Sequence, residues 1–98
     1  MSQTVLITGA GKGFGRLTAE TLLNASHKVV ASMRDINGRN KEHADALRQQ
    51  GAVVVEIDVT DEQSIGTGVT EALRQVETID ILINNAGVGA LGLQEAFT

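Results

Sequence analysis

The sequence contains no cysteine. Neither a disulfide framework nor a cysteine-based metal site can therefore form in it, and we expect no metal site. Aromatic residues are almost as scarce, because Phe14 and Phe97 are the only two and there is no tyrosine or tryptophan. Any hydrophobic core must consequently be built from valine, isoleucine, leucine and alanine.

Long apolar runs and clusters of basic residues are also missing. The longest apolar runs are far shorter than a membrane span, and the N-terminus lacks the basic and apolar regions of a signal peptide. The formal net charge of -4 argues against a nucleic-acid partner, because phosphate contacts need clustered Lys and Arg. We therefore expect a cytoplasmic protein with neither a nucleic-acid nor a membrane partner.

What the sequence does contain is a regular alternation of apolar runs and helical patterns. The 98 residues allow one small domain. We expect strands at 4–8, 28–33, 52–57 and 79–83, with a helix following each of the first three. The helices begin at Phe14, at Lys41 and after Thr60, whose pairing with Gln63 fits a capping box. Gly51 is expected to cap the second helix. This alternation predicts an α/β fold with a parallel sheet, right-handed crossovers, helices on both faces and strand order 3-2-1-4.

Two unusual stretches follow the first and fourth expected strands. The first is Thr8-Gly9-Ala10-Gly11-Lys12-Gly13-Phe14-Gly15, which leads into a helix, and the second is Asn84-Asn85-Ala86-Gly87. A strand, a glycine-rich turn and a helix N-terminus form a phosphate site, because free N–H groups and the helix dipole face the anion. With strand order 3-2-1-4, both stretches should meet at one crevice at the carboxyl edge of the sheet.

These stretches match a known family. Thr8-Gly9-x-x-x-Gly13-x-Gly15 resembles the cofactor motif of the short-chain dehydrogenase/reductases, and Asn84-Asn85-Ala86-Gly87 resembles that family's second motif. Asp58, after the third strand, resembles the acid that meets the adenine ring. The resemblance implies a Rossmann-type doubly wound sheet of which this chain is a truncated half. Residues 1–98 would form its dinucleotide-binding N-terminal part, about two-fifths of a typical member.

The resemblance also implies which residues bind the cofactor. They are Gly9, Gly11, Lys12, Gly13, Phe14 and Gly15 at the pyrophosphate, Lys12 and Arg34 at a 2′-phosphate, Asp58 and Val59 at the adenine, and Asn85, Ala86 and Gly87 at the ribose. Gly11 departs from the family, since many members carry Ser there, and we expect a more flexible loop. A purely structural alternative remains for several of these residues. Asp58 can cap its turn, Asn84 and Asn85 can form a turn, and the two basic residues can be surface charges.

The end of the second strand indicates the choice of cofactor. NAD-binding folds usually place a carboxylate there against the ribose 2′-hydroxyl, whereas NADP-binding folds place a basic group near the 2′-phosphate. Alignment with the family puts Met33 at the acid's position, followed by Arg34, while Asp35 lies one step further on and is expected to face solvent. Because guanidinium matches phosphate oxygens, we expect NADP rather than NAD.

The catalytic element of the family is absent from this sequence. Members interconvert carbonyls and alcohols by hydride transfer, with a tyrosine activated by a lysine four residues on, and this chain has no tyrosine. We therefore expect an enzyme fragment with no catalytic residue of its own, from a homo-oligomeric oxidoreductase acting on a small molecule. A bare, apolar fourth strand supports this interpretation.

Two alternatives remain open. The first is a stand-alone nucleotide-binding or regulatory module that dimerises through the edge of the fourth strand. The second is a flavodoxin-like or receiver-type domain, which would need a phosphate loop or an acidic cluster at the first strand but not Asn84 to Gly87. His27 and His43 lie among polar residues and are expected to be solvated surface side chains.

Overall fold

The computed structural model describes residues 2–11 and 13–85. Within them lie four strands, β1 (Thr4–Thr8), β2 (Lys28–Met33), β3 (Val53–Glu56) and β4 (Ile81–Asn84), and three helices, α1 (Gly13–Asn24), α2 (Lys41–Gln49) and α3 (Glu62–Val76). The strands form one parallel sheet in the order β3-β2-β1-β4, so the predicted fold class and strand order are confirmed.

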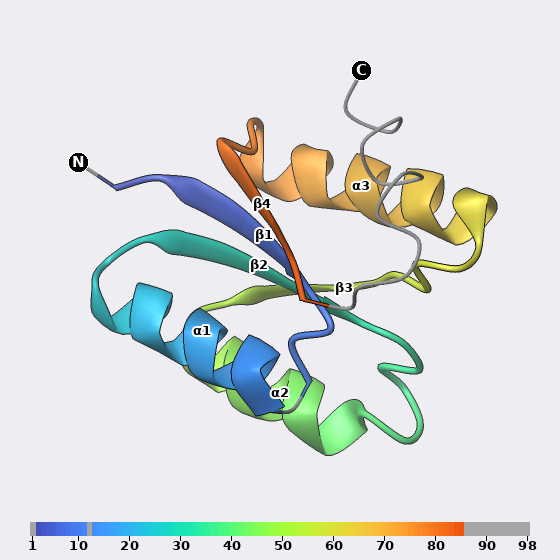
Figure 1. Cartoon of the computed structure of the whole chain (residues 1–98), viewed down its shortest axis with the longest axis horizontal. Coiled ribbons are helices and arrows are strands. Elements are labelled where there is room, and N and C mark those ends of the chain that lie inside the picture. Colours follow the sequence, from blue (N-terminus) through green and yellow to red (C-terminus); the bar gives the residue numbers. More distant parts are fainter. Residues whose placement is uncertain (1, 12, 86–98) are drawn as a thin grey trace.

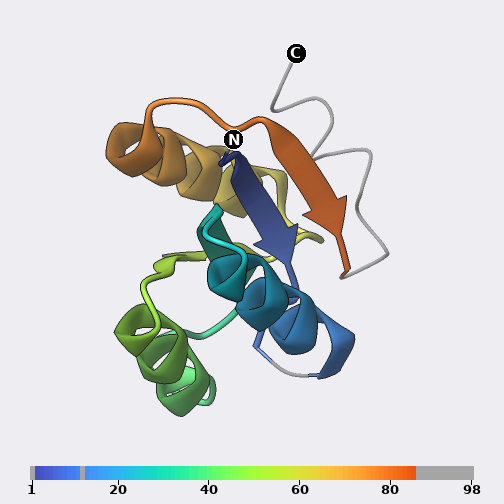
Figure 2. The same ribbon diagram turned by 90° about the vertical axis from the view of Figure 1, so that its left-hand side faces the viewer.

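The sheet lies between two layers of helices. Helices α1 and α2 cover one face and α3 covers the other (Figure 1). The view from the side shows the same layers, with β1 and β4 between α3 and the α1–α2 pair (Figure 2). This arrangement follows from parallel pairing, because each crossover must carry its helix over one face of the sheet.

The core consists of two aliphatic clusters, one on each face of the sheet. Alternate strand residues point to opposite faces. Val5 and Ile7 therefore pack with Ala19, Ala44 and Leu47 on the α1–α2 side. On the other side the cluster contains residues of β1, β2, β3 and α3 and the residue after β3, namely Leu6, Val30, Val55, Ile57, Ile65, Val69, Ala72 and Val76. All five residues of β1 are buried, as expected for the inner strand between β2 and β4.

The expected element bounds differ from the structure mainly at the third helix. Its N-cap is Asp61, whose side chain accepts hydrogen bonds from the Gln63 and Ser64 backbone N–H groups, so the prediction of Thr60 as the cap is wrong. The reason is local competition, because the Thr60 hydroxyl donates to Asp58 Oδ1 at 2.7 Å instead. Strands β3 and β4 also differ from the expected 52–57 and 79–83, and β4 extends to Asn84.

Gly51 ends α2 as expected. It follows the C-cap residue Gln50 and has a positive φ of 102°, which glycine adopts readily. In the part of the chain that the structure describes, no helix is both long enough and apolar enough to cross a membrane.

Candidate functional site

The candidate site lies at the carboxyl edge of the sheet, where the two unusual stretches meet. β1 and β4 pair in register, with Thr8 opposite Asn84. The Thr8 hydroxyl lies 2.8 Å from Asn84 Oδ1, and Asn85 Nδ2 donates to the Gly9 carbonyl oxygen at 3.2 Å. The predicted convergence of the glycine-rich turn and Asn84-Asn85 is therefore present. Asn84 lies in β4, and the two asparagine side chains tie the end of that strand to the end of β1, a different structural role from the turn that the sequence left open.

The glycine-rich turn needs its glycines for two separate reasons. Gly9 and Gly13 have φ values of 64° and 63°, in the left-handed region that residues with a Cβ avoid. Gly15 is needed for space instead, because a Cβ there would overlap the Gly9 carbonyl oxygen and lie 2.6 Å from Asn85 Nδ2. The start of α1 can therefore lie directly against the end of β1 and the residue that follows β4.

A second set of contacts ties the turn to β2. The Ala10 N–H donates to the Ser32 carbonyl oxygen at 3.0 Å, and the buried Ser32 hydroxyl donates to the Ile7 carbonyl oxygen at 3.1 Å. Gly11 is buried beside Met33, whose sulfur lies 3.4 Å from the position of a Cβ on Gly11. The residue in the family's acid position is thus a buried thioether that packs beneath the turn.

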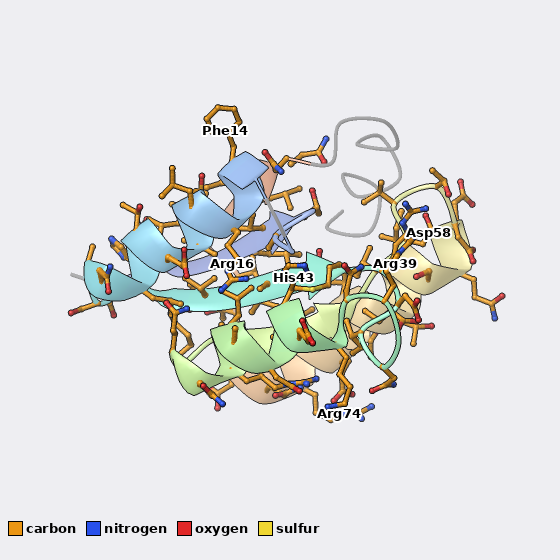
Figure 3. All side chains as sticks on the ribbon, turned by 90° about the horizontal axis from the view of Figure 1, so that it is seen from below. Phe14, Arg16, Arg39, His43, Asp58 and Arg74 are labelled. Carbon is orange, nitrogen blue, oxygen red and sulfur yellow. The ribbon has the colours of Figure 1, made fainter. Side chains whose placement is uncertain are left out.

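The structure places most, but not all, of the predicted cofactor residues. Phe14 is 81% exposed in the first turn of α1 and points away from the other labelled side chains (Figure 3). Its ring therefore does not pack in the turn. Lys12, Ala86 and Gly87 lie outside the described residues. The assignment of all these residues to a cofactor stays a prediction.

The loop after β2 folds back on itself, and the Asp35 carboxylate accepts a hydrogen bond from within it. Asp35 has a φ of 50°, and its Oδ2 accepts the Arg39 backbone N–H at 2.9 Å. A Cβ on Gly38 would lie 2.6 Å from Asp35 Oδ1, so the carboxylate sits directly over its own turn. The residue is exposed, as expected, and one oxygen of its carboxylate bonds within the loop.

A pocket opens beside this loop. It has a volume of about 260 Å³ and is lined by Arg34, Arg39, Asn40 and His43. Asn40 Nδ2 donates to the Arg34 carbonyl oxygen, which fixes the loop at both of its ends. No carboxylate is among these lining residues, so the pocket presents two guanidinium groups, an amide and an imidazole.

Asp58 and Val59 follow β3 at the same edge of the sheet. Asp58 Oδ1 accepts hydrogen bonds from the Thr60 hydroxyl and the Thr60 N–H, and its own N–H donates to Ser64 Oγ at 2.8 Å. The Thr60 hydroxyl, then the Thr60 N–H and the Arg34 charge lower the pKa of the Asp58 carboxyl, against the opposing effect of desolvation. Val59 is half-buried against the α3 side of the core. Asp58 therefore does cap its turn, and Arg34 lies close enough to influence its charge.

Sequence reasoning missed the part of this site that comes from the start of α2. His43 was expected to be solvated, but it is half-buried and its Nδ1 lies 3.1 Å from Arg16 Nη1 on α1 (Figure 3). His27 is also bonded, since its Nδ1 accepts the Gln3 N–H. The polar loop 34–40 could be recognised from its composition, but its path could not. The three residues Arg39, Asn40 and His43 therefore gave no signal that they share a pocket with Arg34.

No group of three or more His, Cys, Asp or Glu side chains that could hold a metal ion occurs among residues 2–11 and 13–85. The polar atoms of the site are instead backbone amides at a glycine-rich turn and basic side chains in a neighbouring pocket. This arrangement suits a ligand with several phosphate groups better than a metal ion.

Comparison with known proteins finds similar sequences and similar solved structures. The sequence is 43% identical over 88 residues to mouse 17-beta-hydroxysteroid dehydrogenase 13, covering 87% of this chain and 28% of that protein. It is 36% identical over 95 residues to an NADP-dependent 3-hydroxy acid dehydrogenase of Salmonella typhi, covering 94% of this chain and 36% of that one. The structure resembles that of NADPH-bound carbonyl reductase from chicken fatty liver with a TM-score of 0.87 and 26% identity, over 98% of this chain and 47% of the reductase.

The chain thus spans less than two-fifths of the length of these two curated relatives. The family profile described as short chain dehydrogenase matches residues 3–98, which is nearly the whole chain. Oxidoreductases of this kind use a nicotinamide cofactor. The chain belongs to the short chain dehydrogenase family.

Proposed function

We propose that this chain forms the NADP(H)-binding segment of an oxidoreductase that interconverts a carbonyl and an alcohol. The observation that carries the choice of NADP is the pocket at the end of β2, which Arg34 and Arg39 line and to which no carboxylate contributes. Arginine presents a planar set of donors that matches phosphate oxygens in pairs.

The surroundings of the pocket also disfavour a ribose 2′-hydroxyl. A carboxylate at the end of β2 would be needed to accept a hydrogen bond from that hydroxyl. Met33 occupies the corresponding position and is buried, while Asp35 is held by the Arg39 N–H of its own turn. The names of the Salmonella and chicken proteins, which mention NADP and NADPH, support the same choice.

The remaining predicted residues each bind a different part of the dinucleotide. The turn from Gly9 to Gly15 and the start of α1 offer backbone N–H groups to the pyrophosphate, and Lys12 and Arg34 hold the 2′-phosphate. Asp58 and Val59 face the adenine, and Asn85, Ala86 and Gly87 line the ribose. The bound nicotinamide supplies the hydride chemistry. This chain holds and orients the dinucleotide, and because it contains no tyrosine we assign it no proton-transfer residue.

The test is the preference for NADPH over NADH, measured by fluorescence titration of the protein with each. We expect NADPH to bind more tightly, and Arg34→Ala to weaken NADPH about 10- to 100-fold while leaving NADH unchanged, because hydrogen bonds to charged groups are the strong ones. Arg74→Ala is the matched control, since Arg74 is an exposed arginine on α3, on the opposite face of the sheet, and pairs with Glu71. A preference for NADH, or equal losses for both cofactors in Arg34→Ala, would overturn the proposal.

A further inference from the structure

His43 makes a contact that determines which of its ring nitrogens carries the proton. Arg16 Nη1 lies 3.1 Å from His43 Nδ1. A guanidinium group has only donors, so Nδ1 must be the acceptor in this pair. The proton of the neutral imidazole is then on Nε2, which makes the other side of the ring a hydrogen-bond donor.

Arg16 is itself held in place from a second direction. Its Nε lies 3.5 Å from Glu20 Oε2, and the same oxygen accepts a hydrogen bond from Gln50 Nε2 at 2.8 Å. The Gln50 hydrogen bond and then the Arg16 charge lower the pKa of the Glu20 carboxyl, against the effect of desolvation. These contacts run from α1 to both ends of α2. Apart from His43 itself, no residue that holds the Arg16 side chain lines the pocket.

The tautomer of His43 matters because His43 lies at the pocket beside the loop after β2. His43 lines the pocket together with Arg34, Arg39 and Asn40, and it belongs to the first turn of α2. The positive end of the helix dipole lies at that turn, which favours an anion in the pocket. A neutral histidine that is free to use either tautomer would present an acceptor, which repels phosphate, for part of the time.

We infer that His43 is a specificity-determining residue for the 2′-phosphate, donating from Nε2, and that Arg16 is a positioning residue that fixes its tautomer. This inference rests on the proposed function and extends its phosphate pocket from the end of β2 onto α2. The ligand class that it concerns is an adenosine with a phosphate on the ribose 2′-oxygen. Arg16 stays outside the pocket and acts only through His43.

The first experiment compares adenosine 2′,5′-bisphosphate with AMP, two probes that differ only in the 2′-phosphate, by calorimetric titration of the protein. We expect His43→Leu to weaken the bisphosphate about tenfold and to leave AMP unchanged, because one donor to a charged group is lost. His43→Gln should recover most of that loss, since its amide restores a donor. His27→Leu is the matched control, because His27 bonds to Gln3 at the N-terminal end of β1.

The second experiment measures the tautomer directly from the ¹⁵N chemical shifts of the His43 ring. The wild-type protein should show Nε2–H alone at a pH where the ring is neutral, and Arg16→Ala should show a mixture of both tautomers. The same variant should lose part of the preference for the bisphosphate. An unchanged Nε2–H signal in Arg16→Ala would overturn the positioning role.

The outcomes separate the two proposals. If the wild-type protein binds adenosine 2′,5′-bisphosphate no better than AMP, the choice of NADP fails and the role of His43 fails with it. If Arg34→Ala abolishes the preference but His43→Leu keeps it, the choice of NADP stands and the role of His43 is wrong. Equal weakening of both probes by His43→Leu would mean that the residue only supports the fold, which also overturns the inference.

Discussion

Gly15 and Asn85 show how the absence of one Cβ atom lets the glycine-rich turn and the residue after β4 make contact. The Asn85 amide reaches the Gly9 carbonyl oxygen only because no Cβ stands on Gly15. The sequence indicated a glycine at this position as a backbone feature of a phosphate-binding turn. The structure adds that its lack of a side chain also lets the second motif contact the first.

Asp58 provides a test of the local hydrogen bonds at the residue scale. Thr60→Val removes the hydroxyl that contributes most to lowering the Asp58 pKa, while the Thr60 N–H and the Arg34 charge remain. We expect the pKa to rise toward the usual Asp value but to stay below it. A ¹³C NMR titration of the Asp58 carboxyl measures this, with Thr70→Val on α3 as the control.

The sign of the pH dependence follows from the direction of that shift. Because the folded-state pKa of Asp58 lies below the unfolded value, this group favours the folded state above the usual Asp pKa of about 3.9. The contribution is lost as the pH falls through the lowered folded-state value. In Thr60→Val this contribution should therefore be smaller, and its loss should be complete at a higher pH than in the wild type. An unchanged Asp58 titration would contradict the role that we assign to the Thr60 hydroxyl.

At the scale of elements, α3 contains two glycines that look alike in sequence but occupy opposite environments. Gly66 is exposed, and a Cβ there would meet nothing within 4 Å. Gly68 is buried, and a Cβ there would overlap the Ile57 side chain and lie 2.7 Å from the Glu56 carbonyl oxygen. Sequence analysis cannot distinguish the two, because the difference depends on how closely α3 approaches β3.

We predict opposite effects of alanine at these two positions. Gly66→Ala should raise the free energy of unfolding by about 0.5–1 kcal/mol, because alanine loses less backbone entropy in a helix. Gly68→Ala should lower it by about 1–3 kcal/mol, because the added methyl group forces α3 away from the sheet. Urea denaturation of the two variants and the wild type measures both values. Equal stabilisation by the two substitutions would show that the close contact of α3 with β3 is wrong.

The turn after β2 illustrates the limit of element-scale prediction. The bounds of β2 and the start of α2 were predicted correctly from apolar periodicity. The connection between them was recognised only as a polar loop. Its path depends on the Asp35 carboxylate and the Asn40 amide, each of which bonds a backbone group a few residues away. Such side-chain bonds leave no periodic pattern in the sequence.

At the scale of the whole molecule, the sheet is asymmetric in its protection from solvent. β1 is buried along its whole length between β2 and β4, whereas in β4 Ile81 is 40% exposed and the other residues are half-buried. Among the described residues, β4 pairs with β1 on one side only. The stability of local structure should therefore decrease from the centre of the sheet toward β4.

Hydrogen exchange tests this gradient. We expect the backbone amides of β1 and β2 to exchange most slowly with solvent. Those of β4 should exchange faster, because fewer buried contacts hold an edge strand in place. NMR or mass spectrometry of the protein in deuterated buffer measures the rates. Protection in β4 equal to that in β1 would mean that another segment or a second copy covers this edge.

The sequence by itself determined the fold and which stretches of the chain meet in the candidate site. Buried parallel strands need continuous apolar runs, and amphipathic helices need apolar residues that recur every 3.6 positions. The local sequence therefore predicts both kinds of element. The glycine-rich turn and Asn84-Asn85 could likewise be recognised in the sequence, because the backbone conformations at such positions favour particular residue types. Only the tertiary structure decided which basic and polar side chains share a pocket. Arg34, Arg39, Asn40 and His43 line that pocket, and Arg16 on α1 contacts His43 from outside it across 27 positions of sequence. No local rule encodes such contacts.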